Sequence, residues 1–346
     1  MKIRGICFWT LLPILLLVAG FALAGPQKAG PGHGAPMEVT ECGTVLTEPG
    51  NYKLVNDLLD CPSMGVMIMG SDIILNVHGH QIACADNDID SGGIIVYSAS
   101  EVWLRNITIK NGHVSNCKDG IVLIQVEDSK VMNMTSTGNH MWFRPDDEAW
   151  VYGTGITLWF TRNTVIMHNH TYDNESHGIG SWDSSGNLFK HNTSTDNGTG
   201  EGVGGAGIDL SNENNSRVMC NRVHGNPDGI MLQPESSGNL IRGNLVTGNM
   251  GGIGMLGFAW DGFFWIDIPA GNTVRSNIVE DNSWVDFYEI YYDLLTGDIL
   301  LQPDDLCMNA WEKNQFQTEL GPAGCFGTPV ELIEKDVCAL DDDHDD

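Results

Sequence analysis

A glycine–isoleucine pair that returns at short intervals restricts the fold of this chain more than any other feature. Each pair is followed by alternating apolar and polar residues, a pattern typical of strands with one buried face. Such short strands cannot bury an apolar face alone, so neighbouring units must stack. The pairs begin at Gly93, Gly120, Gly155, Gly178, Gly207, Gly229 and Gly252, at intervals of 22 to 35 residues.

The length of the repeat selects one stacked architecture. No useful helical periodicity separates the units, which excludes βαβ and leucine-rich repeats, and a propeller blade would need about 40 residues. We therefore predict an all-β chain, a single-stranded right-handed parallel β-helix of about 9–10 coils with a cap at each end. Asparagines that close the units are expected to form a hydrogen-bonded ladder at a turn; they are Asn139, Asn174, Asn197, Asn226, Asn249 and Asn282.

The ends of the chain predict its organisation. Lys2 and Arg4 precede an apolar run that closes on Ala22-Leu23-Ala24, the pattern of a secretory signal peptide. We expect a signal peptide over residues 1–24, a flexible segment over 25–38, the β-helix over 39–316, and a C-terminal cap with an acidic tail over 317–346. The mature chain is expected to be secreted or periplasmic, monomeric and without stable membrane insertion.

The cysteines fit export. Nine are present, and removal of Cys7 with the signal leaves an even number, which favours disulfides in an oxidising compartment. Sequence alone leaves the pairing open. We expect Cys42–Cys61, part of the N-terminal cap, and Cys84–Cys117 as local bridges, with Cys307–Cys325 as a further candidate.

The formal net charge of −28 limits the partners. A surface of this sign repels nucleic acid and bare polyanionic polymers. It suits neutral or basic ligands, or an anionic polymer bridged by divalent cations.

Several motifs resemble those of the secreted right-handed β-helix repeat proteins of the pectate lyase-like superfold. These are Cys42-Gly-Thr, Glu48-Pro-Gly-Asn-Tyr, Ile74-Leu-Asn-Val-His-Gly-His and Asn309-Ala-Trp-Glu-Lys-Asn-Gln-Phe, together with the Gly-Ile units. The resemblance covers about residues 39–316 and implies the fold. It implies several activities, since the group includes polysaccharide lyases, hydrolases, epimerases and proteins of unassigned role, so the site must decide.

Alternation places the second and fourth residues after each glycine on the outer face. The fourth-residue row contains Tyr97, Trp159 and Trp182, and the two tryptophans should stand about 4.8 Å apart on adjacent coils. An exposed row of aromatics suits sugar stacking, which predicts a polysaccharide or glycan as partner. A ladder that only stabilises the sheet, or a surface covered by a loop, is the alternative.

The longest insertion, residues 139–154, lies next to that row. Long loops on rigid scaffolds commonly carry function. Trp142 and Arg144 are predicted to contact a saccharide, and Asp146, Asp147 and Glu148 are predicted Ca²⁺ ligands because Ca²⁺ prefers carboxylate oxygens. A capping loop whose tryptophans cover an apolar face is the alternative.

The predicted acid–base residues are His177, Asp183, Asp209 and Glu235. Glycoside hydrolysis needs two carboxylates at a set separation, whereas lyases and epimerases need a base at a sugar carbon. The paired-Asp and Arg-Ile-Lys elements of polygalacturonases and the Asp-Pro-His-Asp element of alginate epimerases are missing from this sequence.

Two other functions stay open. A non-catalytic structural or surface-interaction protein would use its loops only to bind partners. A periplasmic metal-handling accessory protein, similar to the β-helix protein that helps mature nitrous-oxide reductase, could use His168, His170, His177 and His191 as Cu or Zn ligands.

Overall fold

The computed structural model describes residues 35–85, 92–98, 102–144, 149–151, 153–200, 204–260, 263–266, 268–293, 295–296, 298–301, 307–322, 324–332 and 338. Over these residues the chain forms strands and no helix, which confirms the all-β prediction. In this part of the chain no helix is long and apolar enough to cross a membrane. The predicted signal peptide and the Asp341–Asp346 tail lie outside the described residues.

One face of the molecule, here called the front sheet, is a ladder of ten parallel strands in register, one from each coil. The ladder matches the predicted number of coils. Its strands are β2 (Thr44–Leu46), β5 (Met64–Ile68), β8 (Gly92–Val96), β11 (Asp119–Ile124), β16 (Ile156–Trp159), β19 (Ile179–Ser185), β22 (Ala206–Asn214), β25 (Asp228–Leu232), β28 (Gly251–Trp260) and β32 (Val285–Asp293).

Two further ladders close each coil, and the long strands β10 (Thr108–Ser115) and β13 (Lys130–Thr137) belong to both. The second ladder also contains β1 (Met37–Val39), β3 (Gly50–Leu54), β6 (Ile73–Asn76), β17 (Val165–Met167), β20 (Leu188–Lys190), β23 (Arg217–Met219), β26 (Leu240–Arg242), β30 (Thr273–Arg275) and β34 (Ala310–Glu312). The third also contains β4 (Leu58–Cys61), β7 (Gln81–Cys84), β18 (His170–Tyr172), β21 (Thr193–Thr195), β24 (Arg222–His224), β27 (Leu245–Thr247) and β31 (Ile278–Glu280).

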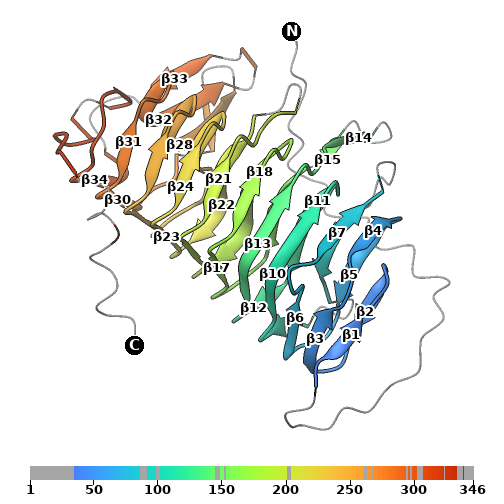
Figure 1. Cartoon of the computed structure of the whole chain (residues 1–346). Coiled ribbons are helices and arrows are strands. Elements are labelled where there is room, and N and C mark those ends of the chain that lie inside the picture. Colours follow the sequence, from blue (N-terminus) through green and yellow to red (C-terminus); the bar gives the residue numbers. More distant parts are fainter. Residues whose placement is uncertain are drawn as a thin grey trace.

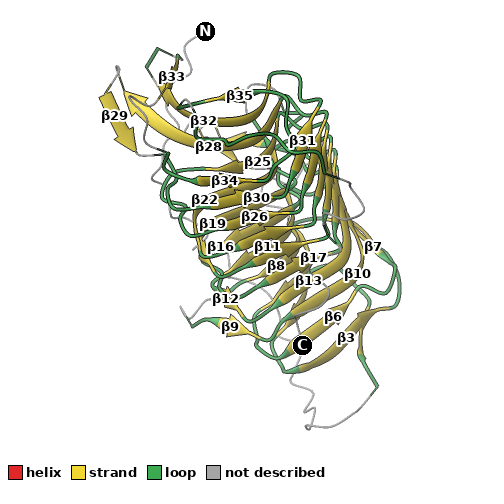
Figure 2. Ribbon diagram, turned by 90° about the vertical axis from the view of Figure 1, so that its left-hand side faces the viewer, coloured by secondary structure: helices red, strands yellow, loops and turns green. Residues whose placement is uncertain are grey.

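The remaining strands extend the edges of this stack. Among them β14 and β15 form an antiparallel hairpin inside the 139–154 insertion. They are β9 (Leu104–Arg105), β12 (Val126–Glu127), β14 (Trp142–Arg144), β15 (Ala149–Val151), β29 (Phe263–Ile266), β33 (Ile299–Leu301) and β35 (Glu319–Leu320). Figure 1 shows the coils stacked in sequence order from the N-terminal to the C-terminal end, and Figure 2 shows the strands as parallel rungs. The architecture is a parallel β-helix.

Columns of aliphatic side chains fill the interior. The isoleucine of every Gly-Ile pair is completely buried, because alternation turns it inward at the same place in each coil. Because equivalent side chains of successive coils stack on one another, the core continues from coil to coil. The column consists of Ile94, Ile121, Ile156, Ile179, Ile208, Ile230 and Ile253.

The predicted asparagine ladder is present. Asn174 donates from Nδ2 to Oδ1 of Asn197 at 2.7 Å, and Asn197 donates to Asn226 at 3.0 Å, with the same contact repeated along the stack. The left-handed backbone belongs to the preceding residue, such as Asp173 or Asp196, and not to the asparagine. The asparagine is therefore selected for its paired amide group.

A second asparagine ladder occupies the corner between the second and third ladders. Asn192, Asn221 and Asn244 hydrogen-bond in sequence at 3.0 and 2.9 Å. From β17 to β31 exactly the same connection recurs, two residues long in every coil, whereas the connections that flank the front sheet vary in length. Insertions such as 139–154 therefore edge the front sheet.

Three disulfides and an aromatic cluster hold the ends. The structure confirms the bridges Cys42–Cys61, Cys84–Cys117 and Cys307–Cys325. At the C-terminal end Phe287 packs against the rings of Trp311 and Phe316 at centroid distances of 4.9 and 5.0 Å, which covers the last coil.

Candidate functional site

Polar side chains, three of them buried and one half-buried, gather on the outer face of the front sheet. His177 precedes β19, Asp209 lies in β22, Asp228 begins β25 and Tyr288 lies in β32. Asp209 is completely buried, while His177 is 5% and Tyr288 2% exposed. We call these four residues the front cluster.

His177 and Asp209 face each other. The Ala206 backbone N–H donates to Nδ1 of His177 at 3.0 Å, which leaves the proton of a neutral imidazole on Nε2. Nε2 lies 3.9 Å from Oδ2 of Asp209, too far for a hydrogen bond. Oδ1 of Asp209 accepts from Nε2 of Gln233 at 2.8 Å, whereas Oδ2 has no hydrogen-bond partner among the described residues.

Burial sets the charge of this pair. Removal from water disfavours an ionised carboxylate and an imidazolium alike. It raises the pKa of Asp209 to about 7 and lowers the pKa of His177 to about 4. Near neutral pH the imidazole is therefore uncharged, and the carboxyl group is poised between its two forms.

Asp228 and Tyr288 form the second half of the cluster. The Tyr288 hydroxyl donates to Oδ1 of Asp228 at 2.7 Å. Burial raises the pKa of Asp228 to about 6, and the charge of Asp209 raises it further. Burial also holds the pKa of Tyr288 well above its usual value, so the phenol keeps its proton.

A stacked tryptophan pair borders the front cluster. The rings of Trp159 and Trp182 are 4.8 Å apart and inclined by 19°, and Trp182 meets the His177 ring at 5.7 Å. The stacking agrees with the predicted spacing, but Trp182 is only 8% exposed and Trp159 is half-buried. The Trp182 ring lies over Gly180, where any Cβ would collide with it. The pair is therefore partly covered and not an open row. Tyr97 stands in the same row two coils away, half-buried, beyond Ile124.

Two predicted catalytic residues lie outside the cluster. Asp183, in β19, and Glu235, in the turn after β25, are exposed residues with left-handed backbone, at φ 52° and 67°. Asp183 accepts a hydrogen bond from Nδ2 of Asn212 at 2.7 Å. Both side chains are exposed, unlike those of His177 and Asp209, so the catalytic role of Asp183 and Glu235 stays a prediction.

The predicted loop residues are not placed in the same way. Trp142 and Arg144 lie in β14, but their side chains fall outside the description, as do Asp146, Asp147 and Glu148 altogether. In the described part of the chain, no three His, Cys, Asp or Glu side chains are grouped to hold a metal ion. The Ca²⁺ site stays a prediction.

Sequence reasoning missed Asp228, Tyr288 and the contact of Gln233. The residue immediately before each glycine of the repeat also faces outward, and this position supplies both His177 and Asp228. Tyr288 was harder to find, because its coil carries Asp286 where other coils have glycine. Gly254, one coil earlier, leaves room for the Tyr288 ring and is the available sequence signal.

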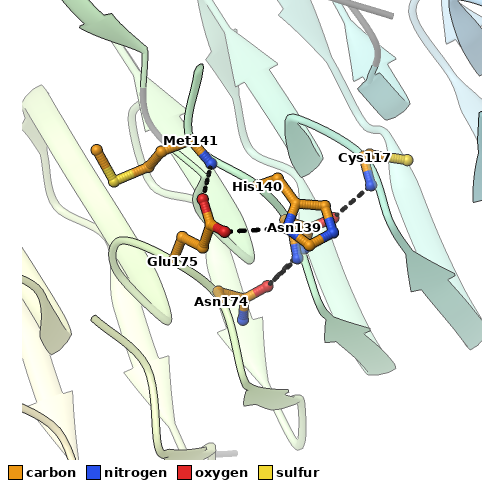
Figure 3. A network of polar contacts seen from close by, with 6 residues as sticks. All are labelled: Cys117, Asn139, His140, Met141, Asn174 and Glu175. Atoms are coloured by element: carbon orange, nitrogen blue, oxygen red, sulfur yellow. Dashed lines mark hydrogen bonds and ion pairs between the residues drawn. The ribbon is translucent and has the colours of Figure 1, made fainter. Parts of the chain in front are cut away.

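The base of the 139–154 insertion is tied to the segment that carries His177 (Figure 3). The Glu175 carboxylate accepts a hydrogen bond from the backbone N–H of Met141 at 2.6 Å and lies 3.2 Å from Nδ1 of His140. Below it, Asn139 donates to Asn174 at 2.6 Å. Because Glu175 is two residues before His177, one short segment positions both the insertion and the cluster.

The three ladders and the coil of 22 or more residues define a parallel β-helix protein. Residues 56–204 match the family described as a right-handed β-helix region. This chain therefore carries a right-handed β-helix domain, as its motifs predicted. Residues 132–284 also match the family described as periplasmic copper-binding protein (NosD).

Solved structures agree on the fold. The A-module of the mannuronan C-5 epimerase AlgE6 of Azotobacter vinelandii is 13% identical, with a TM-score of 0.52, over 83% of this chain and 84% of that one. The periplasmic alginate epimerase AlgG is 16% identical, with a TM-score of 0.52, over 83% and 74%. At this identity the similarity establishes the fold alone. A comparison with curated protein sequences finds no significant match.

Proposed function

We propose that this chain acts outside the cytoplasm, where it binds a glycan over the front sheet and modifies it by proton transfer at the front cluster. The observation that carries the proposal is the completely buried Asp209 carboxylate, whose Oδ2 has no hydrogen-bond partner among the described residues and lies 3.9 Å from the His177 imidazole. An unsatisfied buried carboxylate destabilises a fold, so its presence favours a function.

The arrangement supplies the groups that acid–base chemistry needs. Asp209, with a pKa of about 7, can accept or return a proton near neutral pH. His177 presents a donor at Nε2, and Tyr288 holds a second proton beside Asp228. These groups suit removal and return of a proton at a sugar carbon, the step shared by lyases and epimerases. We favour this reaction over hydrolysis.

The flanking aromatics support a glycan as substrate. Sugars stack on aromatic rings, and the Trp159–Trp182 pair adjoins the cluster. On its other side, Trp284 is 39% exposed and lies 5.5 Å from the Tyr288 ring. The two epimerases that share the fold act on alginate or mannuronan, which favours polysaccharides. The net charge of −28 favours a neutral glycan or an acidic one carried with cations.

The three disulfides support the location, since such bridges persist in oxidising compartments. The predicted signal peptide and the periplasmic family match also support secretion or periplasmic residence.

The proposal is tested on a panel of neutral and acidic polysaccharides, with and without Ca²⁺. Products are followed as unsaturated ends, as reducing ends, and as deuterium taken up from heavy water, which reports epimerisation. Asp209→Asn and His177→Gln should abolish the change that the wild type produces.

The matched control is Asp183→Asn, which neutralises an exposed carboxylate on the same coil and should keep full activity. A wild type that binds glycans but alters none would favour the non-catalytic alternative. Equal activity in all three variants would remove the front cluster from the mechanism.

A metal-handling accessory role is the second candidate, favoured by the periplasmic copper-binding family match over residues 132–284. The His168 and His191 rings stack at 5.1 Å on adjacent coils. Copper titration of the wild type and of the His168→Gln, His191→Gln double variant tests this role. Stoichiometric binding that the double variant loses would support it.

A further inference from the structure

The cysteines that remain outside the three bridges are placed for a fourth. Cys220 and Cys338 carry thiols that are not bonded to each other in the structure. They are 118 residues apart in sequence, and one lies in the coils while the other lies near the C-terminus. A bond between them requires that the fold brings the two cysteines together.

Cys220 occupies the constant two-residue corner between the second and third ladders. The same corner position holds His168, His191 and Gly243 in neighbouring coils, all with left-handed backbone. His168 is exposed there, whereas Cys220 is 6% exposed. The preceding residue shows the same contrast, since Met219 is 6% exposed and its counterparts Met167, Lys190 and Arg242 are half-buried. This one corner of the stack is covered.

Cys338 lies at the same corner. Its Sγ is 3.2 Å from the carbonyl oxygen of Gly243. Gly243 is the direct neighbour of Cys220, because the Cys220 backbone N–H donates to the carbonyl of Arg242 at 3.1 Å and Asn221 pairs with Asn244. Adjacent strands are about 4.8 Å apart. A disulfide joins cysteines whose Cα atoms are about 4.4–6.8 Å apart, and the Cys338 sulfur contacts the residue that lies one strand spacing from Cys220.

We propose that Cys220 and Cys338 form a fourth disulfide in the exported protein. One thiolate attacks the disulfide of a thiol oxidoreductase of that compartment and forms a mixed disulfide, which the second thiolate resolves. The Cys220–Cys338 bond forms, both thiol protons pass to solvent, and the two electrons reduce the oxidoreductase disulfide to a dithiol.

The bridge would fix Cys338 to the coils. It joins Cys338 to the end of β23, on the face of the solenoid away from the front sheet. The three existing bridges close 18 to 33 residues, so this one would be the long-range bridge of the molecule.

The test is peptide mapping of the full chain, purified from an oxidising compartment and alkylated before any reduction. We expect a linked pair of peptides that contain Cys220 and Cys338, two hydrogens lighter than the separate thiol peptides. Thiol titration in denaturant should find less than 0.2 thiol per mature chain, about tenfold below the two thiols of an unbridged chain.

Three outcomes would overturn the proposal. Both residues could be alkylated in the folded or unfolded wild type. A non-reducing gel could show a covalent dimer that Cys338→Ser abolishes. Metal analysis could find an ion that protects both thiols and that a chelator removes. Cys220→Ser and Cys338→Ser are the matched variants, and in the bridged case each should expose one new thiol while the three other bridges stay intact.

Discussion

Two sets of buried polar side chains lie on the same coils, and they are built in opposite ways. In the asparagine ladders each buried amide both donates to and accepts from its neighbours in the stack, so nothing is left unpaired. In the front cluster Oδ2 of Asp209 is buried, has no hydrogen-bond partner in the part of the chain that the structure describes, and lies 3.9 Å from His177. The ladders repeat in coil after coil, whereas the cluster occurs once.

The difference separates buried polar groups that stabilise the fold from buried polar groups that serve a function. A buried polar group that is fully paired stabilises its fold, and one that is unpaired costs free energy. Removing a ladder amide should therefore harm stability, while neutralising the cluster should harm activity and improve stability.

The largest expected effect is on the ladder. Asn221→Ala deletes the Oδ1 that accepts from both the backbone and the side chain of Asn192 at 2.9 and 3.0 Å, and the Nδ2 that donates to Asn244. Several buried groups lose their partners, so the free energy of unfolding should fall by about 3 kcal/mol. Urea unfolding measures it, and exposed Asn51→Ala is the control, expected within about 0.5 kcal/mol of wild type.

In the front cluster, the stability contributed by Asp209 should depend on pH. The folded state holds the Asp209 proton up to a pKa of about 7, whereas the unfolded chain releases it near 3.8. Asp209 therefore contributes stability that is lost as pH rises from about 4 to about 7. The pKa of His177 is lowered to about 4, so His177 contributes stability that is gained as pH rises from about 4 to about 6.5. Because the wild type and the Asp209 variant both contain His177, its contribution cancels when their stabilities are subtracted.

Asp209→Asn should thus gain stability relative to wild type as pH rises from 4 to 7 and level off above 7, by on the order of 2 kcal/mol. Thermal melts at six pH values measure the difference, with Asp183→Asn as control. A difference that is constant over this pH range would contradict the burial of an ionisable Asp209.

The tryptophan pair should show a smaller effect, and on binding. Trp159 is the more exposed member, so Trp159→Ala tests the platform with the least damage to packing. Losing one aromatic contact should weaken glycan binding by about 1 kcal/mol, roughly fivefold. Calorimetric titration with the best glycan of the panel measures it. Trp182→Ala should in addition lower the melting temperature, because that ring covers Gly180.

Trp284 should show the smallest effect. It is 39% exposed beyond Tyr288, four coils from Trp182, which is about 19 Å at the spacing of strands. Trp284→Ala should weaken binding of long glycans by about 0.5 kcal/mol, roughly twofold, and leave short ones unchanged. Equal effects on both lengths would place Trp284 at the centre of the contact instead of its end.

The fold was predictable because its signal repeats. Each of the seven Gly-Ile pairs predicts an inward isoleucine at the same place in its coil, so a wrong assignment in one coil is corrected by the assignments in the others. The cluster does not repeat, and side chains from separate coils meet there. Asp209 is the second residue after its glycine, where alternation points outward, but Asp228 and Tyr288 depend on two glycines that leave room, Gly251 and Gly254. The burial of Trp182 could not be predicted, because alternation shows to which face of the sheet a side chain points and not which residues cover that side chain.

The constant corner between the second and third ladders has a consequence for how such a chain can change. Every coil from β17 to β31 has two residues and one asparagine at that corner. An added residue would displace the asparagine and break its hydrogen bonds to the asparagines of the two neighbouring coils. The connections beside the front sheet also contain a ladder asparagine, such as Asn174 or Asn197, but the number of residues between that asparagine and the next front strand varies from coil to coil. New segments can therefore accumulate only along the margins of one face, so a solenoid of this type can acquire a new ligand without redesigning its interior.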